Sequence, residues 1–449
     1  MSCDYDLAII GTGVAASTVA TKVRAAGQSV VAIDSRPFGG TCALRGCDPK
    51  KLLLAGADAV DHAQRATAKG VRAEPVLDWP TLQSARRRFT NEMQESMEEL
   101  YESHGIKGFH GRARFTGTNS LAIGDTKISA EHILIAAGAE PVSLDMPGAE
   151  HLTTSDEFLE LDRLPQRIVL VGGGYVAAEF SHIAACGGAE VTILQRGERL
   201  LKNFDPDLVG WLAGKFERLG IEVETGTEVR SIETNDNELV VTARRGDRTI
   251  RRAADLVVHA AGRVPALEDL NLAAGGVDVR GGRLVLNEFL QSASNPSVYA
   301  AGDAAQMGPP LTPVSSQDGH VVAANLLEGN HRSPDYRGTP SVAFTLPPIA
   351  AVGFSEAEAR NLDLAFTVNS DLASDWFTAR QADEPVYGYK VLVEDETRRI
   401  LGAHLVGPRV DEVINLFALA IRAQMTADQL KQMPFAYPTT ASDIPSMLS

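Results

Sequence analysis

The chain has 449 residues, a formal net charge of −16 at pH 7, 44% hydrophobic residues and 22% charged residues. This composition is ordinary for a globular protein of two or three domains, and the acidic balance argues against a nucleic-acid partner. We expect a cytoplasmic protein with no membrane contact. No basic leader precedes the first strand, no run of about 18 apolar residues occurs, and the four cysteines suit a reducing compartment.

The first segment in chain order predicts a dinucleotide-binding unit. Residues 7–34 read as a buried strand, a glycine-rich turn, a helix and a second strand that ends at Asp34. Gly11, Gly13 and Ala16 have the GxGxxA spacing that lets backbone N–H groups approach a pyrophosphate at a helix N-terminus. Asp34, about 20 residues further on, is expected to accept hydrogen bonds from a ribose.

Two cysteines, five residues apart, lie between a glycine pair and a predicted helix. The stretch reads GGTCALRGCDPKK over residues 39–51. Asp48 is expected to cap this helix and Pro49 to occupy its first position. The positive end of the helix and the two following lysines favour the thiolate form of Cys47. A thiolate that is stable in the reduced state is typical of a redox-active disulfide and not of a structural one.

The dinucleotide-binding unit occurs twice. Residues 7–34 and 168–195 align without a gap, and two such units imply two nucleotide cofactors. The alignment pairs Gly11 with Gly172, Gly13 with Gly174 and Ala16 with Ala177.

The second unit differs from the first at the position that meets the ribose. Gln195 stands where the first unit has Asp34, and Arg196, Arg199 and Lys202 follow. A carboxylate would repel a 2′-phosphate, whereas an arginine accommodates it. This pattern favours NADPH over NADH; the alternative is that the basic residues form a solvated loop.

The cysteine stretch resembles the redox motif of the class I flavoprotein disulfide reductases, written GGTCxNxGCxPxK, which include glutathione reductase, dihydrolipoamide dehydrogenase and mercuric reductase. The resemblance covers nearly the whole chain. It implies that Cys42 and Cys47 form a redox-active disulfide, with Cys47 nearer the flavin and Cys42 attacking the substrate. Leu44 replaces the usual Asn, and Arg45 and Asp48 replace apolar residues, which bears on the redox potential and the substrate.

The same resemblance implies FAD at the first nucleotide site and a nicotinamide at the second. Glu179 matches a residue that pairs with a lysine near the flavin, here Lys50 or Lys51. Tyr175 matches an aromatic lid over the nicotinamide pocket; the alternative is an ordinary aromatic residue at a helix start. The remaining implied cofactor contacts are Gly40, Thr41, Ala137, Gly138, Gly262, Asp303, which would bind the ribityl chain, and Thr312, which opens a helix towards the flavin.

The fold class implied is α/β, with two Rossmann-like FAD- and NAD(P)-binding domains and a C-terminal α+β dimerisation domain. The expected FAD domain comprises residues 1–145 and 265–337, the NAD(P)H domain residues 146–264, and the dimerisation domain residues 338–449. A homodimer is expected, because the family borrows an active-site residue from the partner subunit.

Two smaller expectations concern single elements. Residues 79–104 predict a long, highly charged helix, and the three arginines at 86–88 are expected to form a solvated face. His404 lies in a predicted strand near the C-terminus and is expected to be structural.

The chain departs from the family near its C-terminus. Most of the family ends in HPTxSE, but here Tyr437 takes the place of the histidine, Ser442 takes the place of the glutamate, and Asp443 comes one residue later. A phenol with a pKa near 10 donates a proton but is a poor base at pH 7. Mercuric reductases also have tyrosine here, but they end in a cysteine pair, and no cysteine follows Cys186 in this sequence.

The sequence therefore predicts an FAD-dependent NAD(P)H:disulfide oxidoreductase of the glutathione reductase type. Electrons would pass from NADPH through FAD to the Cys42–Cys47 disulfide and on to a disulfide or other thiol-reactive acceptor, with Tyr437 as the acid. Two alternatives stay open: a soft-metal reductase of the mercuric type, and a flavin electron carrier or redox sensor that uses the dithiol as a switch. The sequence does not choose the acceptor.

Overall fold

The computed structural model describes residues 3–72, 74–236 and 238–449. The chain forms two compact units, each made of three segments. The first unit comprises Met1–Lys51, Ser84–Val142 and Arg263–Tyr336, and the second comprises Leu52–Gln83, Ser143–Gly262 and Arg337–Ser449. The finer division into three domains stays a prediction. Within the described residues, no helix combines the length and apolar character that a membrane crossing needs.

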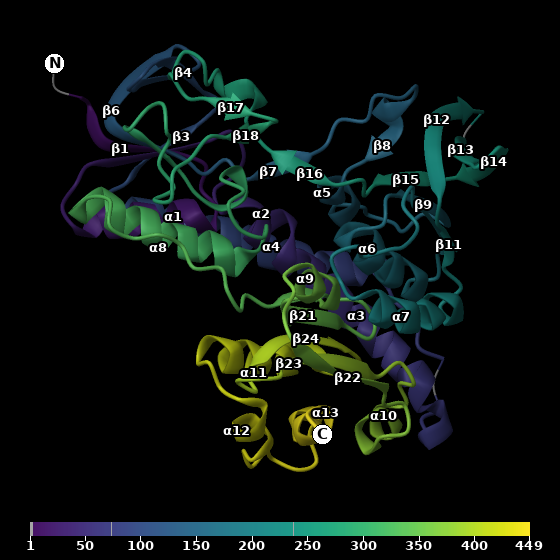
Figure 1. The fold of residues 1–449 in the computed structure, drawn as a ribbon. Helices are drawn as coiled ribbons and strands as arrows, with labels where there is room; N and C mark the ends of the chain where they lie inside the picture. Colours follow the sequence, from purple (N-terminus) through teal and green to yellow (C-terminus); the bar gives the residue numbers. More distant parts are fainter. Residues whose placement is uncertain (1–2, 73, 237) are drawn as a thin grey trace. The chain divides into compact units, whose positions relative to one another are not determined.

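A seven-stranded sheet forms the centre of the first unit (Figure 1). Its order is β3-β2-β1-β6-β5-β4, and β19 also pairs with β6. The central strands are parallel, and β4, β5 and β6 pair antiparallel. The strands are β1 (Tyr5–Ile10), β2 (Val30–Asp34), β3 (Lys107–His110), β4 (Ala113–Gly117), β5 (Ser120–Ile123), β6 (Thr126–Ile135) and β19 (Val298–Ala300). Two antiparallel strand pairs accompany it: β7 (Ala139–Pro141) with β16 (Arg263–Pro265), which is distant in sequence, and β17 (Val279–Arg280) with β18 (Arg283–Leu284).

Two helices, α1 (Val14–Ala25) and α8 (Thr312–Glu328), lie side by side in the first unit (Figure 1). They approach closely at Gly319, because glycine has no side chain there. A Cβ at this position would lie only 2.9 Å from the carbonyl oxygen of Ala15. The hydrophobic core beneath them includes Ile9, Leu134 and Val322, none of which is exposed. The other helical elements here are α2 (Gly40–Arg45), the start of α3 (Cys47–Arg65), most of α4 (Trp79–Ser103), η3 (Glu268–Leu270) and η4 (Gly302–Ala304).

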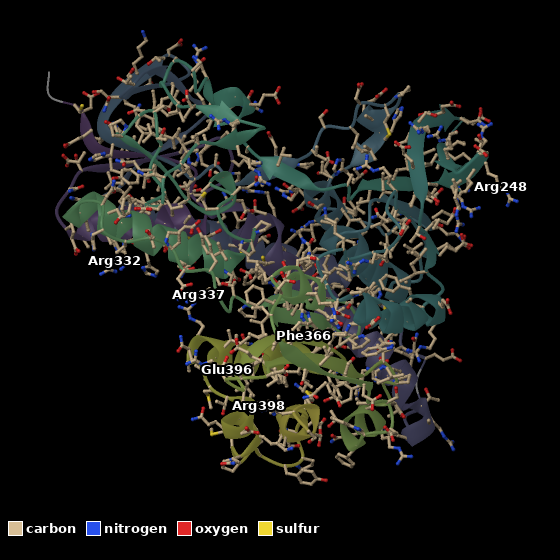
Figure 2. The ribbon with its side chains drawn as sticks, in the orientation of Figure 1. Arg248, Arg332, Arg337, Phe366, Glu396 and Arg398 are labelled. Carbon is tan, nitrogen blue, oxygen red and sulfur yellow. The ribbon has the colours of Figure 1, made fainter. Side chains whose placement is uncertain are left out.

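The second unit contains two sheets between residues 143 and 262. A five-stranded parallel sheet has the order β11-β10-β9-β15-β8, and a three-stranded antiparallel sheet has the order β12-β13-β14. Figure 2 shows Arg248 projecting from the hairpin between β13 and β14. The elements are η2 (Ala149–His151), β8 (Leu152–Thr153), α5 (Ser155–Leu159), β9 (Arg167–Val171), α6 (Tyr175–Cys186), β10 (Glu190–Leu194), α7 (Pro206–Arg218), β11 (Glu222–Glu224), β12 (Thr227–Asn235), β13 (Glu238–Arg245), β14 (Arg248–Ala254) and β15 (Leu256–His259).

The C-terminal part of the second unit is a five-stranded antiparallel sheet in the order β20-β21-β24-β23-β22, with α11 packed on β21 and β24. Phe417 of α11 and Tyr387 are fully buried in its core. The elements are β20 (Ser341–Ala343), β21 (Ile349–Gly353), α9 (Glu356–Asn361), β22 (Phe366–Leu372), α10 (Phe377–Ala382), β23 (Gly388–Glu394), β24 (Ile400–Val406), α11 (Val410–Arg422), α12 (Ala427–Lys431), η5 (Thr440–Asp443) and α13 (Ile444–Met447); η1 (Ala66–Lys69) follows α3.

Two local predictions are wrong. Helix α3 begins at Cys47, so Asp48 lies inside its first turn and does not cap it. The break falls at Gly46, which separates α2 from α3. Arg86 is fully buried, although its neighbour Arg88 is exposed. The reason is helical geometry: Arg86 shares one face of α4 with the buried Thr90, four residues on.

A buried ion cluster joins three segments of the second unit. Lys215 of α7 lies 2.6 Å from Asp61 of α3 and 3.0 Å from Glu384, which follows α10. The three side chains are only 4%, 5% and 2% exposed. Arg65, one turn after Asp61, adds a 2.8 Å contact to the Asp61 carboxylate. Arg65 also lies 3.6 Å from the Glu384 carboxylate, so Lys215 is the more buried of two cations that face the same carboxylate pair.

Lys215→Ala should lower the free energy of opening of α7 by about 3–5 kcal/mol, because removing one partner leaves buried charge uncompensated. Native-state hydrogen exchange of the α7 amides measures this quantity. The control is Arg360→Ala, which breaks an exposed i,i+4 pair with Glu356 and should cost no more than about 0.5 kcal/mol. Equal losses in the two variants would contradict the assigned role of Lys215.

Candidate active site

The first glycine-rich turn depends on close backbone contacts. Gly11 has a φ of +108°, and a Cβ there would overlap the carbonyl oxygen of Ala136. Gly40, with a φ of +72°, lies against Gly13, and a Cβ on Gly40 would overlap the Cα of Gly13. No side chain caps the start of α1. The first-turn N–H groups of α1 are therefore left to a ligand.

Asp34 anchors this turn from the end of β2. Its Oδ2 accepts hydrogen bonds from the backbone N–H of Thr12 at 3.0 Å and from the Thr12 hydroxyl at 2.7 Å. Its Oδ1 accepts one from the N–H of Arg36 at 3.0 Å. The sequence pattern missed this anchoring role, and the predicted contact of Asp34 with a ribose stays a prediction.

The structure brings both cysteines of the motif together with Thr312. Cys42 lies in α2, Cys47 begins α3, and both are free thiols. Thr312, the first residue of α8, donates from Oγ1 to the Sγ of Cys42 at 3.1 Å, and its Oγ1 lies 3.5 Å from the Sγ of Cys47. Thr312 was predicted only as a flavin contact. No local pattern indicates its thiol contacts, because 270 residues separate it from Cys42.

The pKa values of the two thiols are shifted in opposite directions. The hydrogen bond between their side chains is the main cause: it lowers the pKa of Cys47 to about 6 and raises the pKa of Cys42. Burial opposes the shift at Cys47, whereas the hydroxyl of Thr312 and the charge of Lys50 add to it. At pH 7, Cys47 therefore carries the negative charge and Cys42 keeps its proton.

The other predicted contacts of the first unit lie around these turns. Asp303 is half-buried in η4, and its carboxylate accepts no hydrogen bond from the described residues. Burial raises the pKa of Asp303, and Arg263 opposes that shift. Such a carboxylate suits a ligand hydroxyl group. Of the remaining residues, Ala16 is buried, Lys50, Ala137 and Gly138 are half-buried, and Thr41 and Lys51 are exposed.

The second glycine-rich turn repeats the geometry of the first in the second unit. Gly172 has a φ of +122°, and a Cβ there would overlap the carbonyl oxygen of Ala260. Gly174 precedes α6, which has no side-chain cap, and the space beside Gly174 is open. Gly262, with a φ of +119°, likewise borders open space. The N-terminus of α6 is thus also available to a phosphate group.

The basic residues of the loop after β10 are of two kinds: one is bonded within the loop, and the others are exposed. Arg199 is committed to the loop itself: it donates to the carbonyl oxygens of Phe204 at 2.7 Å and Lys202 at 2.8 Å. Arg196 and the Lys202 side chain are exposed, and neither forms an ion pair with any residue that the structure describes. Only these two cations are therefore free to meet a 2′-phosphate.

Tyr175 and Glu179 both lie on α6. The Tyr175 ring meets Phe204 edge-on, with 5.6 Å between the centroids, and burial raises the pKa of Tyr175 to about 12, opposed by a hydrogen bond with Ser341. Glu179 is 4% exposed, and its Oε1 accepts a 2.7 Å hydrogen bond from the N–H of Phe344. The predicted pairing of Glu179 with a lysine of the redox motif stays a prediction.

The C-terminal segment leaves its tyrosine outside the core. Tyr437 is 80% exposed. Ser442 closes a local turn, in which its N–H donates to the Thr439 hydroxyl at 3.3 Å. Asp443 accepts a 2.7 Å hydrogen bond from the hydroxyl of Tyr387. Asp443 is thus bonded to a side chain in the core of the C-terminal part of the second unit.

His404 is structural, as expected. It is 3% exposed, and its Nε2 lies 3.0 Å from the carbonyl oxygen of Phe354. Burial lowers its pKa, so the imidazole stays neutral in β24.

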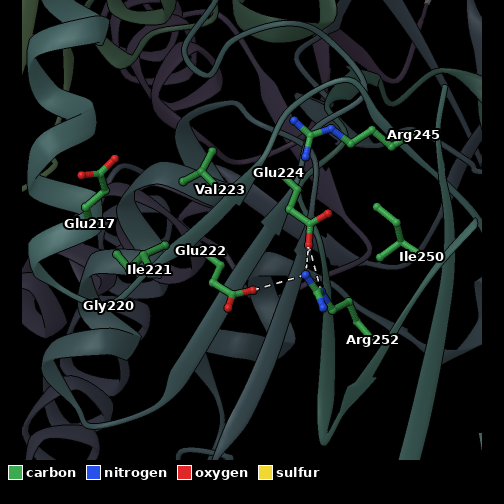
Figure 3. Close-up of a pocket in the computed structure, with 9 residues that line it drawn as sticks. All are labelled: Glu217, Gly220, Ile221, Glu222, Val223, Glu224, Arg245, Ile250 and Arg252. Atoms are coloured by element: carbon green, nitrogen blue, oxygen red, sulfur yellow. Dashed lines mark hydrogen bonds and ion pairs between the residues drawn. The ribbon is translucent and has the colours of Figure 1, made fainter. Parts of the chain in front are cut away.

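A cavity of about 670 Å³ lies elsewhere in the second unit, at the edge strand β11 (Figure 3). Arg252 bonds Glu224 at 2.9 Å and lies 3.5 Å from Glu222, so the acidic lining is largely neutralised. None of the predicted site residues lines this cavity. Its lining residues are Glu217, Gly220, Ile221, Glu222, Val223, Glu224, Arg245, Ile250 and Arg252.

Comparison with protein families identifies this architecture. Residues 5–319 match the family described as pyridine nucleotide-disulphide oxidoreductase, and residues 339–448 match the dimerisation domain of that family. The chain belongs to the pyridine nucleotide-disulphide oxidoreductase family. The expected α/β fold class is thereby confirmed, and so are the two cofactor classes, because the enzymes of this family are FAD- and NAD(P)H-dependent flavoproteins.

The relatives include several kinds of reductase. The chain is 32% identical to a mercuric reductase of Staphylococcus aureus, over 98% of this chain and 81% of that protein, and 31% identical to a glutathione reductase of Burkholderia cepacia, over 98% and 97%. A Cu(II) complex of the HOCl-induced flavoprotein disulfide reductase RclA from Escherichia coli superposes with a TM-score of 0.89 at 26% identity, covering 100% of this chain and 99% of that one. These similarities establish the family and leave the acceptor open.

The geometry of this family member fits both cofactors. In the first unit, the uncapped start of α1, the Gly13–Gly40 contact and the half-buried carboxylate of Asp303 suit a pyrophosphate and a polyol chain, as in FAD. In the second unit, the open, uncapped start of α6 and the exposed Arg196 suit a nicotinamide dinucleotide.

In the reduced protein, Cys47 should react with iodoacetamide with a midpoint near pH 6, because a lowered pKa keeps the thiolate populated until the pH falls through that value. Site-resolved mass spectrometry separates Cys47 from the other cysteines. Thr312→Val removes a hydrogen bond to the sulfur and should move the midpoint to higher pH. Thr18→Val, whose hydroxyl bonds only within α1, is the matched control. An unmoved midpoint in Thr312→Val would show that the contact has no electrostatic effect.

Arg196→Ala should raise the Kd for NADPH by about tenfold and leave NADH within about twofold, because a charge-assisted bond to the 2′-phosphate is lost. Equilibrium binding to the purified protein measures both constants. Arg248→Ala, an exposed arginine on the β13–β14 hairpin (Figure 2), controls for loss of positive charge in the same unit. Equal weakening for both nucleotides would contradict a 2′-phosphate role for Arg196.

Proposed function

We propose that this chain is an NADPH-dependent flavoprotein reductase whose Cys42–Cys47 pair passes electrons to a disulfide or another thiol-reactive acceptor. The observation that carries the proposal is the set of Cys42, Cys47 and Thr312, where one hydroxyl contacts both sulfurs. The hydrogen bond between the two thiols lowers the pKa of Cys47 and raises that of Cys42. Family membership supports it. The four free cysteines suit the reducing cytoplasm.

The proposed division of labour follows the two nucleotide turns. When bound, NADPH would supply two electrons as a hydride, and FAD would accept them and relay them to the disulfide. Gly11, Gly13 and Asp303 would hold FAD, and Arg196 with Lys202 would bind the 2′-phosphate of NADPH. The three-domain boundaries given above and the pairing of Glu179 with Lys50 or Lys51 belong to the same proposal.

The dithiol chemistry with a disulfide acceptor balances in two exchanges. The Cys42 sulfur, after losing its proton, attacks one sulfur of the acceptor, and the first thiol leaves with a proton. The Cys47 thiolate then attacks the Sγ of Cys42 in the mixed disulfide, the second product leaves as a thiolate, and the Cys42–Cys47 disulfide forms. Two electrons reach the acceptor, and the pair is oxidised.

Proton transfer is the step at which this chain differs from most of the family. The attacking sulfur is the one that keeps its proton, since the pKa of Cys42 is raised. We propose a homodimer, supported by the matching dimerisation domain, in which the partner subunit's Tyr437 protonates the leaving thiolate. At pH 7 a phenol is protonated and is a poor base for removing the proton of Cys42, so turnover with disulfides should be slow.

A soft-metal acceptor is a second candidate, favoured by the same feature. A metal ion held between two thiolates has no leaving thiol to protonate, so the loss of histidine at position 437 has no cost for that reaction. Relatives named mercuric reductase and the Cu(II) complex of RclA point the same way. For this chain, the metal would be a substrate that meets Cys42 and Cys47 directly.

Anaerobic titration with NADPH, followed by visible absorbance, tests the proposal. One equivalent should produce a broad band at longer wavelength than the main flavin peak, because the Cys47 thiolate lies beside oxidised flavin, and Cys47→Ser should abolish it. Turnover with disulfides, and with Hg(II) or Cu(II) in excess thiol, then separates the two acceptors. Cys42→Ser should stop both reactions, and Cys186→Ser is the matched control.

Direct bleaching of the flavin without such a band would remove the Cys pair from the electron path. NADPH oxidation by quinones that survives Cys42→Ser, with no disulfide or metal turnover in the wild type, would favour the flavin electron carrier instead.

A further inference from the structure

A buried carboxylate behind the proposed flavin turn is not used by the chemistry above. Asp318 lies in the second turn of α8 and is 1% exposed. Its Oδ2 accepts a 3.0 Å hydrogen bond from the backbone N–H of Gly302, and its Oδ1 accepts a 2.8 Å hydrogen bond from the hydroxyl of Tyr336. All three residues belong to the first unit. Asp318 therefore ties one helix to two loop segments.

Gly302 is the residue immediately before Asp303, and its space is restricted. It has a φ of +67°, and a Cβ there would lie 2.9 Å from the Ser315 hydroxyl and 3.4 Å from the Cβ of Ala15. The turn is thus held between α1 and α8. Without Asp318, the N–H of Gly302 would be a buried donor with no acceptor. Such an unpaired group costs a large amount of folding free energy for a single hydrogen bond.

Tyr336 fixes the other side of the same turn. A Cβ at Gly308 would lie 2.8 Å from its ring, so Tyr336 packs on the loop that leads from η4 to α8. The neighbouring Asp335 accepts a 2.8 Å hydrogen bond from the Gln317 side chain through its carbonyl oxygen. The segment of Asp335 and Tyr336 therefore holds the loop against the start of α8.

The helix that carries Asp318 also carries Thr312, six residues earlier. We infer that Asp318, held by Gly302 and Tyr336, is a positioning residue that sets both the Gly302–Asp303 turn and the placement of Thr312 against the two cysteine sulfurs. The inference rests on the proposed roles of Asp303 and Thr312. It couples the flavin-binding turn to the redox pair through one buried carboxylate.

The charged groups near Asp318 are consistent with an ionised anchor at neutral pH. Burial raises its pKa to about 6, and the charge of Asp303 adds to this, whereas the hydrogen bonds from Tyr336 and Gly302 oppose it. Burial beside Asp318 raises the pKa of Tyr336, which keeps the phenol as a donor.

Three variants separate positioning from plain stability. Asp318→Ala removes both hydrogen bonds, and Tyr336→Phe removes one of them. Asp318→Asn keeps an oxygen that can accept from Gly302 and an amide that can donate to the Tyr336 oxygen, so it is the conservative rescue. Tyr299→Phe is the control: Tyr299 lies three residues before Gly302, but its hydroxyl bonds Asn330 at 2.8 Å and Gln291 at 3.1 Å and takes no part in the contacts of Asp318.

The Kd for FAD, measured by quenching of FAD fluorescence on adding apoprotein, is the first readout. We expect about tenfold or greater weakening in Asp318→Ala and about threefold in Tyr336→Phe, and wild-type affinity within about twofold in Asp318→Asn and Tyr299→Phe. The second readout is the pH midpoint of Cys47 alkylation in the apoprotein, which should rise in Asp318→Ala and Tyr336→Phe alone.

The inference is overturned if Tyr336→Phe and any Asp318 variant that folds lower the melting temperature yet bind FAD and titrate Cys47 like the wild type. It is also overturned if Tyr299→Phe has the same effect as Tyr336→Phe. These readouts do not involve an acceptor, so failure of the proposed reductase activity in the wild type would leave them unchanged and is distinguished from failure of this inference.

Discussion

The contact between the backbones of Gly13 and Gly40 is the constraint on which the first unit depends. It places the redox segment directly against the nucleotide turn, with no side chain between them. Because α2 starts at Gly40, the position of Cys42 is set by this contact, and Cys47 follows one short helix later. Any residue with a Cβ at position 40 would push the dithiol away from the turn. The position of the two cysteines therefore depends first on the packing of the backbone.

A second layer of the site comes from the far end of the same unit. Helix α8 supplies Thr312 to the sulfurs, and it packs on α1 at Gly319. The proton distribution between the two thiols then follows from their mutual hydrogen bond and from one shared hydroxyl neighbour. The difference between the two sulfurs is thus a property of geometry, since the residues themselves are chemically identical.

Much of the fold could be predicted from the sequence, because its signals are local. The glycine spacing, the apolar strands and the internal repeat each lie within about 30 residues, and the family motifs gave the cysteine pair. The sequence did not predict β22, whose residues are mostly polar and partly exposed, or the burial of Arg86. The contact of Thr312 with the sulfurs, and the commitment of Arg199 to its own loop, depend on tertiary placement that no short pattern encodes.

The hydrogen bond between Tyr387 and Asp443 has a consequence for the engineering of this active site. Introducing a histidine at position 437 alone would supply an imidazole without an orienting carboxylate. Ser442 is bonded to Thr439 within a turn, and Asp443 is bonded to Tyr387. An isolated imidazole samples both tautomers and several rotamers. Conversion to a glutathione-reductase-like acid–base pair would therefore require two coordinated substitutions, at 437 and 442, with little benefit from either one alone.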